Sequence, residues 1–352
     1  MSTPDAFSLS CPIPHASSPV ITMAHGGGGT AMHRLIEDVF YQAFQNPVLA
    51  QRHDASRLDV AGARLAFTTD SYVVQPLEFP GGDIASLAVH GTVNDLAMAG
   101  ARPLCLSAGF ILEEGFSIET LRRLTASMRR AADACRVCIA TGDTKVIERR
   151  GAGDGLFINT AGIGVIEHDR VIGPAEVRQG DTILVNGDLG RHGIAVMAVR
   201  EGLEFETAIE SDSAPVAHAV LGLLDAGIEV HCLRDLTRGG LVSAANEIAQ
   251  AAGVGLHFRE TDIPVRDDVR GACELLGFDP LYVANEGRFM AIIRAEDAPR
   301  ALELLRDHPQ APQPAVIGEV RAETPGRVTL ESRIGAQRIL DMLSGEQLPR
   351  IC

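Results

Sequence analysis

The sequence predicts an α+β protein built from two domains. Its 352 residues are enough for two hydrophobic cores. Strand-like and helix-like segments follow one another with a similar rhythm in both halves of the chain. Between the halves, Gly173-Pro174 and the polar residues up to Asp181 are typical of a linker. We therefore expect an arm with a glycine loop and a helix over 1–50, a first domain over 51–170, a second domain over 175–322, and a C-terminal tail over 323–352.

The first half opens with Ser- and Pro-rich residues up to about residue 24, which we expect to form a mobile arm. Apolar residues at helical spacing then predict helices from Met32 to Phe44 and from Gly82 to about Ala99. Ser117 is a candidate N-cap for a third helix, because its hydroxyl can accept a bond from the first turn. The predicted strands are Arg64–Val74, Leu104–Leu112, Arg136–Ala140 and Leu156–Ile166.

The second half has the same alternation. Its predicted strands are Ile183–Val185, Glu229–Cys232, Gly255–Phe258, Phe289–Ile293, Glu319–Arg321 and Val328–Leu330. Its predicted helices are Ile194–Arg200, Val216–Leu224, a helix that ends at Ala251, and Ala298–Arg306. A helix-like run from Ile334 to Leu343 precedes the end of the chain.

The acidic composition argues against nucleic acid or an anionic membrane as a partner, because 46 Asp and Glu against 31 Lys and Arg give a net charge of −15. No apolar run approaches the roughly eighteen residues that span a bilayer, and no secretion signal is apparent. We expect a cytoplasmic protein whose seven cysteines are reduced thiols. Cys135 and Cys138 form a lone C-x-x-C, and without a second pair we interpret them as ordinary thiols.

A glycine-rich loop, His25-Gly26-Gly27-Gly28-Gly29-Thr30, precedes the first predicted helix. Glycines let a backbone approach a ligand closely, and free N–H groups at a helix start can bind an anion. The loop lacks the Gly-Lys-Ser/Thr ending of a P-loop, so a flexible hinge is an equal alternative.

Three aspartates of the first half, Asp70, Asp95 and Asp143, stand at strand ends or at polar breaks in apolar segments. Carboxylates that converge from separate elements are what Mg²⁺ bound to a polyphosphate requires. Each aspartate taken alone is more often a cap or a turn residue. Three of them beside a glycine-rich loop favour a metal–phosphate site.

Two further segments add candidate groups. Thr237-Arg238-Gly239-Gly240 offers a cation at a helix start, which suits a phosphate oxygen, although Arg238 could equally pair with a nearby acid. Lys145 could reach the same phosphates, with a solvated surface charge as the alternative. Glu286, between an apolar segment and a glycine, is a candidate buried base whose pKa desolvation would raise, or else a structural acid.

The last residue of the sequence is a cysteine. Cys352 follows a polar stretch and Pro349-Arg350-Ile351, so we expect a flexible arm that carries a thiol at its tip. A frayed terminus that happens to end in cysteine is the simpler alternative.

Seven motifs distributed from His25 to the end of the chain form a distinctive set. They are His25–Gly29, Thr68–Ser71, Pro80–Ile84, Gly91–Ala97, Thr141–Val146, Arg234–Gly240 and Pro349–Cys352. Together they resemble the HypE family of hydrogenase maturation factors, within the ATP-binding superfamily of aminoimidazole ribonucleotide (AIR) synthetase, selenophosphate synthetase and thiamine-phosphate kinase. The terminal cysteine separates this family from its relatives.

The resemblance implies a two-domain PurM-like fold whose first domain pairs with a second copy in a dimeric β-barrel. It also implies ATP held by Mg²⁺ between the domains, with Asp70, Asp95 and Asp143 as the metal-binding acids. Residues that match nucleotide-site motifs are Gly26, Gly27, Gly28, Asn94, Asp235, Thr237 and Arg238. Lys145 and Glu286 match positions near the modified thiol of Cys352. Arg191 is a departure, because an acid is expected there.

The activity implied by the resemblance is ATP-dependent dehydration of an S-carbamoyl group on Cys352 to a thiocyanate. The cyanide would pass to the iron of a nickel–iron hydrogenase, with the carbamoyltransferase HypF and the HypC–HypD complex as partners. One alternative is a superfamily enzyme that acts on a free small molecule, such as a selenophosphate synthetase that uses Cys11. A second is a scaffold that binds nucleotide without turnover, which the set of acids, Lys145 and Glu286 argues against.

Overall fold

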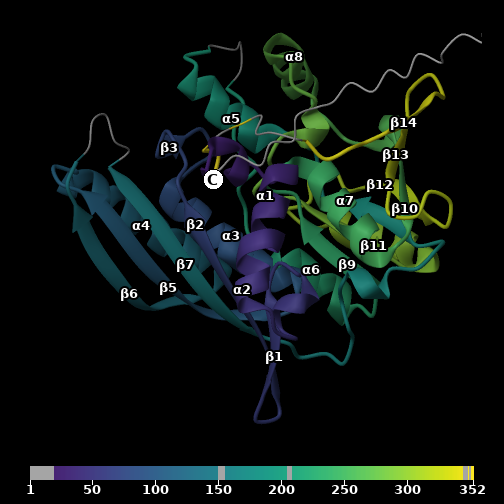
Figure 1. The fold of residues 1–352 in the computed structure, drawn as a ribbon, viewed down its shortest axis with the longest axis horizontal. Helices are drawn as coiled ribbons and strands as arrows, with labels where there is room; N and C mark the ends of the chain where they lie inside the picture. Colours follow the sequence, from purple (N-terminus) through teal and green to yellow (C-terminus); the bar gives the residue numbers. More distant parts are fainter. Residues whose placement is uncertain (1–19, 150–154, 204–207, 344–347, 349) are drawn as a thin grey trace, which may run out of the picture.

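The computed structural model describes residues 20–149, 155–203, 208–343, 348 and 350–352, which form two sheet-based domains side by side (Figure 1). The first domain has a five-stranded sheet in the order β1-β2-β7-β5-β6. Its strands are β1 (Ser56–Val60), β2 (Ala63–Tyr72), β5 (Arg102–Glu113), β6 (Cys138–Ile147) and β7 (Leu156–Val165). Neighbouring strands are antiparallel except for β5 and β6, which are parallel.

One face of this sheet is covered by α3 (Ile84–Met98) and α4 (Ile118–Cys135). Leu87 and Val93 of α3 pack there in a core with Leu106 and Ile158 of the sheet, all at most 1% exposed. The opposite face leaves apolar side chains in the open: Phe67, Ile111, Ile147 and Ile163 are 40–44% exposed. Every residue of the edge strand β6 is exposed as well. Such a face is typical of a surface that meets a partner.

The second domain has a seven-stranded sheet in the order β14-β13-β10-β12-β8-β11-β9. Its strands are β8 (Thr182–Val185), β9 (Val230–Asp235), β10 (Gly255–Arg259), β11 (Phe289–Ile293), β12 (Ala315–Arg321), β13 (Val328–Glu331) and β14 (Gln337–Ile339). Its helices are α5 (Arg191–Arg200), α6 (Ala217–Asp225), α7 (Gly240–Ala252), α8 (Asp267–Leu276) and α9 (Ala298–Arg306). A short hairpin of β3 (Glu78–Phe79) and β4 (Gly82–Asp83) precedes α3.

Several predicted elements are confirmed because local chemistry specifies them. Asp83 caps α3, and its carboxylate accepts bonds from the amides of Ala85 and Ser86. Ser117 caps α4 through the amide of Thr120. The uninterrupted apolar run Phe289–Ile293 forms the fully buried strand β11.

The prediction of a helix from Ile334 to Leu343 is wrong. Gly335, at φ +80°, turns the chain so that β14 pairs with β13. The pairing ties β14 into the second sheet through backbone hydrogen bonds, which helix propensity over a few residues cannot outweigh. The chain up to Ile339 therefore belongs to the second domain, beyond the expected boundary at residue 322.

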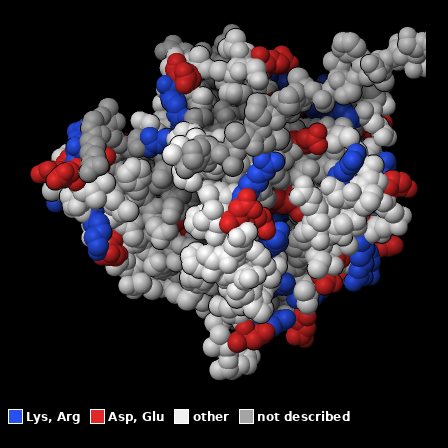
Figure 2. All heavy atoms as spheres, viewed as in Figure 1, with Lys and Arg blue, Asp and Glu red and all other residues white. Residues whose placement is uncertain are grey.

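The N-terminal helix crosses in front of the junction between the two domains (Figure 1). It consists of α1 (Thr30–Leu35), a π-helical segment (Ile36–Tyr41) and α2 (Gln42–Phe44). No helix in the described part of the chain combines the length and the apolar character that crossing a bilayer would require. On the face shown in Figure 2, acidic and basic side chains are interspersed.

Candidate functional site

The glycine-rich loop and the Thr237–Gly240 segment, some 210 residues apart in sequence, lie against each other. The Nη1 atom of Arg238 donates to the carbonyl of Gly26 at 3.1 Å. Gly28 has a φ of +73°, and a Cβ there would lie 2.8 Å from the carbonyl oxygen of Arg238. Only glycine fits this contact, so the loop is shaped to pack on Arg238.

Asp70 and Asp95 lie together where β2 meets α3. Asp70 accepts a bond from the hydroxyl of Tyr72 at 3.0 Å, and Asp95 accepts one from the hydroxyl of Thr68 at 2.7 Å. Burial raises the pKa of both carboxyl groups, and the charge of Asp70 raises that of Asp95 further. Asp235 lies at the end of β9, and burial and neighbouring acids, including Asp70, raise its pKa well above the usual value.

Glu286 is buried at the same site, with 3% of its surface exposed. Its Oε1 atom has no hydrogen-bond partner among the residues that the structure describes. Burial, followed by the charges of Asp235, Asp212 and Asp70, raises the pKa of Glu286 well above its usual value. A carboxyl group in this environment is poised to take up a proton.

Asn94 is placed differently from the other residues that match nucleotide-site motifs. Its Nδ2 atom donates to the carbonyls of Ala214 and Glu286, and its Oδ1 atom accepts from the amide of Val216. Because backbone groups occupy both ends of this buried amide, the side chain braces the loop that carries Glu286.

Cys352 lies inside the site rather than on a free arm. The carbonyl of Cys352 accepts a bond from the amide of Val73 at 3.0 Å, and Ile351 is 2% exposed. The thiol lies near Arg238, Glu286 and Asp70, whose charges act on it. Burial raises the pKa of the Cys352 thiol to about 12. Pro349, which the sequence places in the tether, and Cys11 are outside the described residues.

Asp143 and Lys145 do not join these groups within the chain. Their strand β6 is separated from β2 by β5 and β7, and three strand spacings of about 4.8 Å amount to roughly 14 Å. Asp70 shares its register row with Thr160 and Ala108, on the face covered by helices. Asp143 shares the next row with Gly109 and therefore projects from the open face. Lys145 pairs with Asp143 there.

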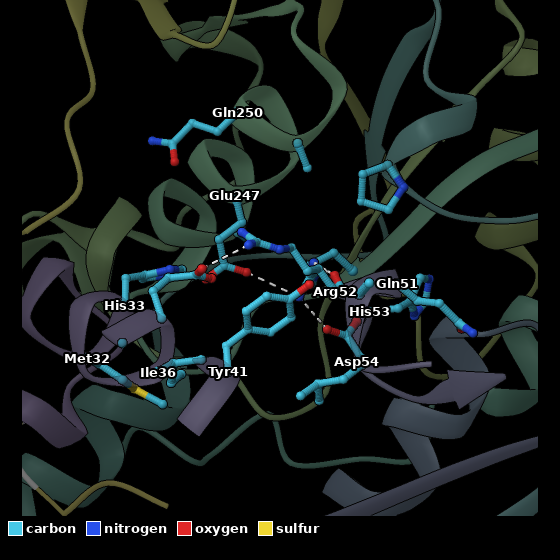
Figure 3. Close-up of a pocket in the computed structure, with 18 of the residues that line it drawn as sticks. Met32, His33, Ile36, Tyr41, Gln51, Arg52, His53, Asp54, Glu247 and Gln250 are labelled. Carbon is cyan, nitrogen blue, oxygen red and sulfur yellow. Dashed lines mark hydrogen bonds and ion pairs between the residues drawn. The ribbon is translucent and has the colours of Figure 1, made fainter. Parts of the chain in front are cut away.

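A chain of ion pairs that sequence reasoning missed leads into the site from the N-terminal helix (Figure 3). His33 contacts Glu247 at 2.9 Å, Glu247 contacts Arg234 at 3.1 Å, and Arg234 contacts Asp54 at 2.6 Å. Burial raises the pKa of Asp54 to about 6 although Arg234 opposes the shift, and within the described part of the chain its Oδ2 atom has no hydrogen-bond partner. A buried carboxylate oxygen without a partner marks Asp54 as a further candidate ligand.

A cavity of about 990 Å³ opens next to Asp54, between the N-terminal helix and α7 (Figure 3). Its lining includes the aromatic side chains of Phe40 and Tyr41 and the polar side chains of Asp235, Thr237 and Arg238. His53 lines the cavity, and neither of its ring nitrogens has a hydrogen-bond partner in the described ranges of the chain. The cavity thus offers both aromatic and charged side chains, which suits a nucleotide.

The acids of the site fit a divalent cation that is shared with phosphate oxygens. Burial raises the pKa of four carboxyl groups, those of Asp54, Asp70, Asp95 and Asp235. The charges of Asp54 and Asp70 raise the pKa of Asp95 and Asp235 further, while Arg234 opposes the shift at Asp54 and Asp235 and Arg238 opposes it at Asp70. No three potential ligands in the described part of the chain form a ready metal cage. Mg²⁺ commonly uses one or two carboxylates together with phosphates and water, so the arrangement suits Mg²⁺.

Two other sequence features have structural roles. Arg191 forms an ion pair with the buried Asp188 at 2.7 Å, which explains how a cation is accommodated at that position. Cys135 ends α4 and Cys138 begins β6, with no metal cluster around them among the described residues.

Comparison with known proteins gives matches along nearly the whole chain. Residues 52–166 match the N-terminal domain of AIR synthase related proteins, and residues 178–331 match the C-terminal domain. The chain is 52% identical over 332 residues to the carbamoyl dehydratase HypE of Azotobacter vinelandii, covering 94% of this chain and 97% of the relative.

Solved structures agree with this relationship. A structure of the hydrogenase maturation protein HypE in complex with ATP is 49% identical, with a TM-score of 0.79, and covers 95% of this chain and 100% of that chain. A HypE–HypF complex contains a chain that is 43% identical, with a TM-score of 0.83, and covers 88% of this chain and 99% of that one.

Proposed function

We propose that this chain, which belongs to the HypE family of AIR synthase related proteins, uses ATP to dehydrate an S-carbamoyl group on Cys352 to a thiocyanate. One observation carries the proposal above all: the thiol of Cys352 is buried beside Arg238, Glu286 and Asp70. The position of this thiol in a site suited to phosphate groups is explained if the thiol carries the substrate.

The chemistry explains why a nucleotide is needed. A carboxamide does not lose its oxygen readily, because hydroxide is a poor leaving group. Transfer of the terminal phosphoryl group from ATP to the amide oxygen, with release of ADP and a proton, turns that oxygen into a phosphate leaving group. Removal of the remaining N–H proton and departure of phosphate then complete the C≡N bond of the thiocyanate.

The residues of the cleft fit distinct parts of this reaction. Arg238 lies next to Cys352 and can stabilise negative charge on the transferring phosphoryl group. Asp70, Asp95, Asp235 and Asp54 would hold Mg²⁺, which supplies charge neutralisation on the phosphates when bound. Glu286, with an unpartnered oxygen near the thiol, is the base that takes the N–H proton.

We propose that ATP occupies the cavity of about 990 Å³, with its phosphates toward Arg238. The unpartnered ring of His53 would then hydrogen-bond the nucleoside part. His53→Leu is expected to raise KM for ATP about five- to tenfold through the loss of one hydrogen bond, with a smaller effect on kcat. Measuring dehydration against ATP concentration tests this; His218→Leu, an exposed histidine of α6, is the control, and an unchanged KM refutes the assignment.

A homodimer would bring Asp143 and Lys145 to the site. Both project from the open face of the first sheet, beside the exposed Phe67, Ile111, Ile147 and Ile163. We infer that this face and the edge strand β6 pair with a second copy, and that Asp143 and Lys145 act in the partner's cleft. The edge strand would then be satisfied and the apolar face covered.

The partners follow from the family. The carbamoyltransferase HypF would load the carbamoyl group onto Cys352, and the HypC–HypD complex would receive the cyanide for the iron of a nickel–iron hydrogenase. The structure of a homologous HypE–HypF complex supports the first of these partners.

A mass measurement tests the function. The protein is incubated with ATP, Mg²⁺, carbamoyl phosphate and HypF, and its intact mass is expected to rise by one cyano group. Cys352→Ala is expected to abolish this gain in mass. Cys138→Ala, which replaces an exposed cysteine of the C-x-x-C pair, is expected to retain it. Equal modification of Cys352→Ala would refute the proposal, and nucleotide binding without any mass change would indicate a non-catalytic scaffold.

A further inference from the structure

His192 connects the tail of the chain to the body of the second domain. It lies in the first turn of α5, is fully buried, and packs edge-on against Phe79 with ring centroids 5.4 Å apart. Its Nε2 atom lies 2.9 Å from the carbonyl oxygen of Ile351, and its Nδ1 atom lies 2.8 Å from the hydroxyl of Ser211. The imidazole therefore bridges the residue before Cys352 and the interdomain segment that contains Ser211.

The partners define which nitrogen carries the proton. A carbonyl oxygen can only accept, so Nε2 must be the N–H that donates to Ile351. The Ser211 oxygen accepts a bond from the amide of Ser213, which leaves its O–H free to donate to Nδ1. The arrangement needs a neutral ring, and burial lowers the pKa of His192 accordingly. The histidine is thus fixed as a donor toward the tail.

The contacts to the tail are mainly to its backbone. The carbonyl of Arg350 accepts from the amide of Gln75 and from Arg200, and that of Cys352 accepts from the amide of Val73. From the second domain, Arg200 donates to the carbonyl of Arg350, whereas His192 donates to that of Ile351, the residue next to Cys352. The other backbone donors, Val73 and Gln75, follow strand β2 of the first domain.

His192 is also linked to the loop that carries Glu286. The amide of Gly193 donates to the carbonyl of Ala284 at 3.0 Å, and the amide of Gly190 donates to Oδ1 of Asn285 at 2.7 Å. The start of α5 and the Ala284–Gly287 loop therefore form one hydrogen-bonded unit. A tail held by His192 is held in a fixed relation to Glu286.

We propose that His192 is a positioning residue that holds the Ile351 carbonyl, and with it the group on Cys352, in register with Glu286. The idea rests on the proposed dehydration, in which the amide on Cys352 must present its N–H proton to Glu286. His192 does not contact the reacting atoms; it determines their position through the backbone of the tail.

The first test measures docking in the protein alone. Each variant is treated with a maleimide, and labelling of Cys352 is followed by peptide mass spectrometry. His192→Ala is expected to label about fivefold faster than the wild type, the effect of one lost hydrogen bond on an equilibrium. His192→Gln, whose amide N–H can reach the position of Nε2, is expected to restore slow labelling.

Controls separate docking from general stability. His257→Ala removes an equally buried histidine that contacts Thr329 instead of the tail, and it is expected to label at the wild-type rate. Ser211→Ala, which frees the ring to adopt the other tautomer, is expected to label faster than the wild type with little change in Tm. Wild-type labelling of His192→Ala, or equal labelling of the Ala and Gln variants, would overturn the proposal.

The second test follows the reaction with ATP, Mg²⁺, carbamoyl phosphate and HypF. His192→Ala is expected to accumulate the carboxamide form of Cys352, and His192→Gln is expected to convert it to the cyano form. Because labelling requires neither ATP nor a carbamoyl donor, the two hypotheses fail separately. A wild-type protein that never gains a cyano group refutes the proposed function, whereas unchanged labelling refutes the role of His192.

Discussion

Replacing Glu286 with glutamine is expected to stop dehydration while loading of the carbamoyl group continues. Glutamine has nearly the same shape, so the buried site keeps its packing, but the amide cannot accept the proton. A lost general base commonly costs about 10²- to 10⁴-fold in rate. Intact mass spectrometry after incubation with ATP, Mg²⁺, carbamoyl phosphate and HypF should then show the carboxamide on Cys352 and little of the cyano form.

The pH dependence gives a second reading of the same residue. A base works in its deprotonated form, so the wild-type rate should rise with pH as Glu286 loses its proton. Because burial raises the pKa of Glu286, this rise should lie above the range of an ordinary glutamate. The rise should be absent in Glu286→Gln and present in Glu303→Gln, an exposed control on α9. Cyano formation at the wild-type rate by Glu286→Gln would exclude Glu286 as the base.

Co-expression of Lys145→Met with Cys352→Ala is expected to restore activity that neither variant has alone. If Lys145 acts across a dimer, a mixed dimer contains one complete site: the Cys352 of one copy beside the Lys145 of the other. Half of the dimers formed at random are mixed, and one of their two sites is complete, so about a quarter of wild-type cyano formation should return. Differently tagged copies and intact mass spectrometry give the measurement.

A second pair of variants serves as the control for this complementation experiment. Glu286→Gln combined with Cys352→Ala should remain inactive, because the docked tail places Cys352 beside the Glu286 of its own chain. Recovery in this control would mean that the tail crosses between copies. No recovery with Lys145→Met would mean that Lys145 does not act in the partner's site.

Elements with strong local signals could be predicted from the sequence. The helix α3 has its Asp83 cap, and β11 has an uninterrupted apolar run. The hairpin of β1 and β2 was missed because its two-residue turn, Ala61-Gly62 with φ of +50° and +86°, lacks the usual Asn-Gly or Asp-Gly signal. The strand β14 was mistaken for a helix because its partner β13, and not its own composition, decides its conformation.

The site, too, contains residues with local sequence signals and residues whose placement depends on the fold. Glycine loops and acids followed by small residues are visible as local patterns, so Gly28, Asp70 and Arg238 could be chosen as candidates one by one. The pairing of Asp54 with Arg234 joins residues 180 positions apart, and no local pattern announces it. The separation of Asp143 from Asp70 depends on the order of four strands, which a linear pattern does not contain.

If the proposed function is correct, the burial of Cys352 determines the order of its two covalent steps, loading and dehydration. A thiol with a pKa of about 12 is ionised in only about one molecule in 10⁵ at neutral pH, and the thiolate is the form that attacks a carbamoyl donor. Loading therefore belongs to the period when the tail is outside. A loaded sulfur has no proton left to lose, so a neutral amide can enter the same cleft without the penalty that a thiolate would meet. The burial of the Cys352 side chain alone would thus ensure that loading precedes dehydration.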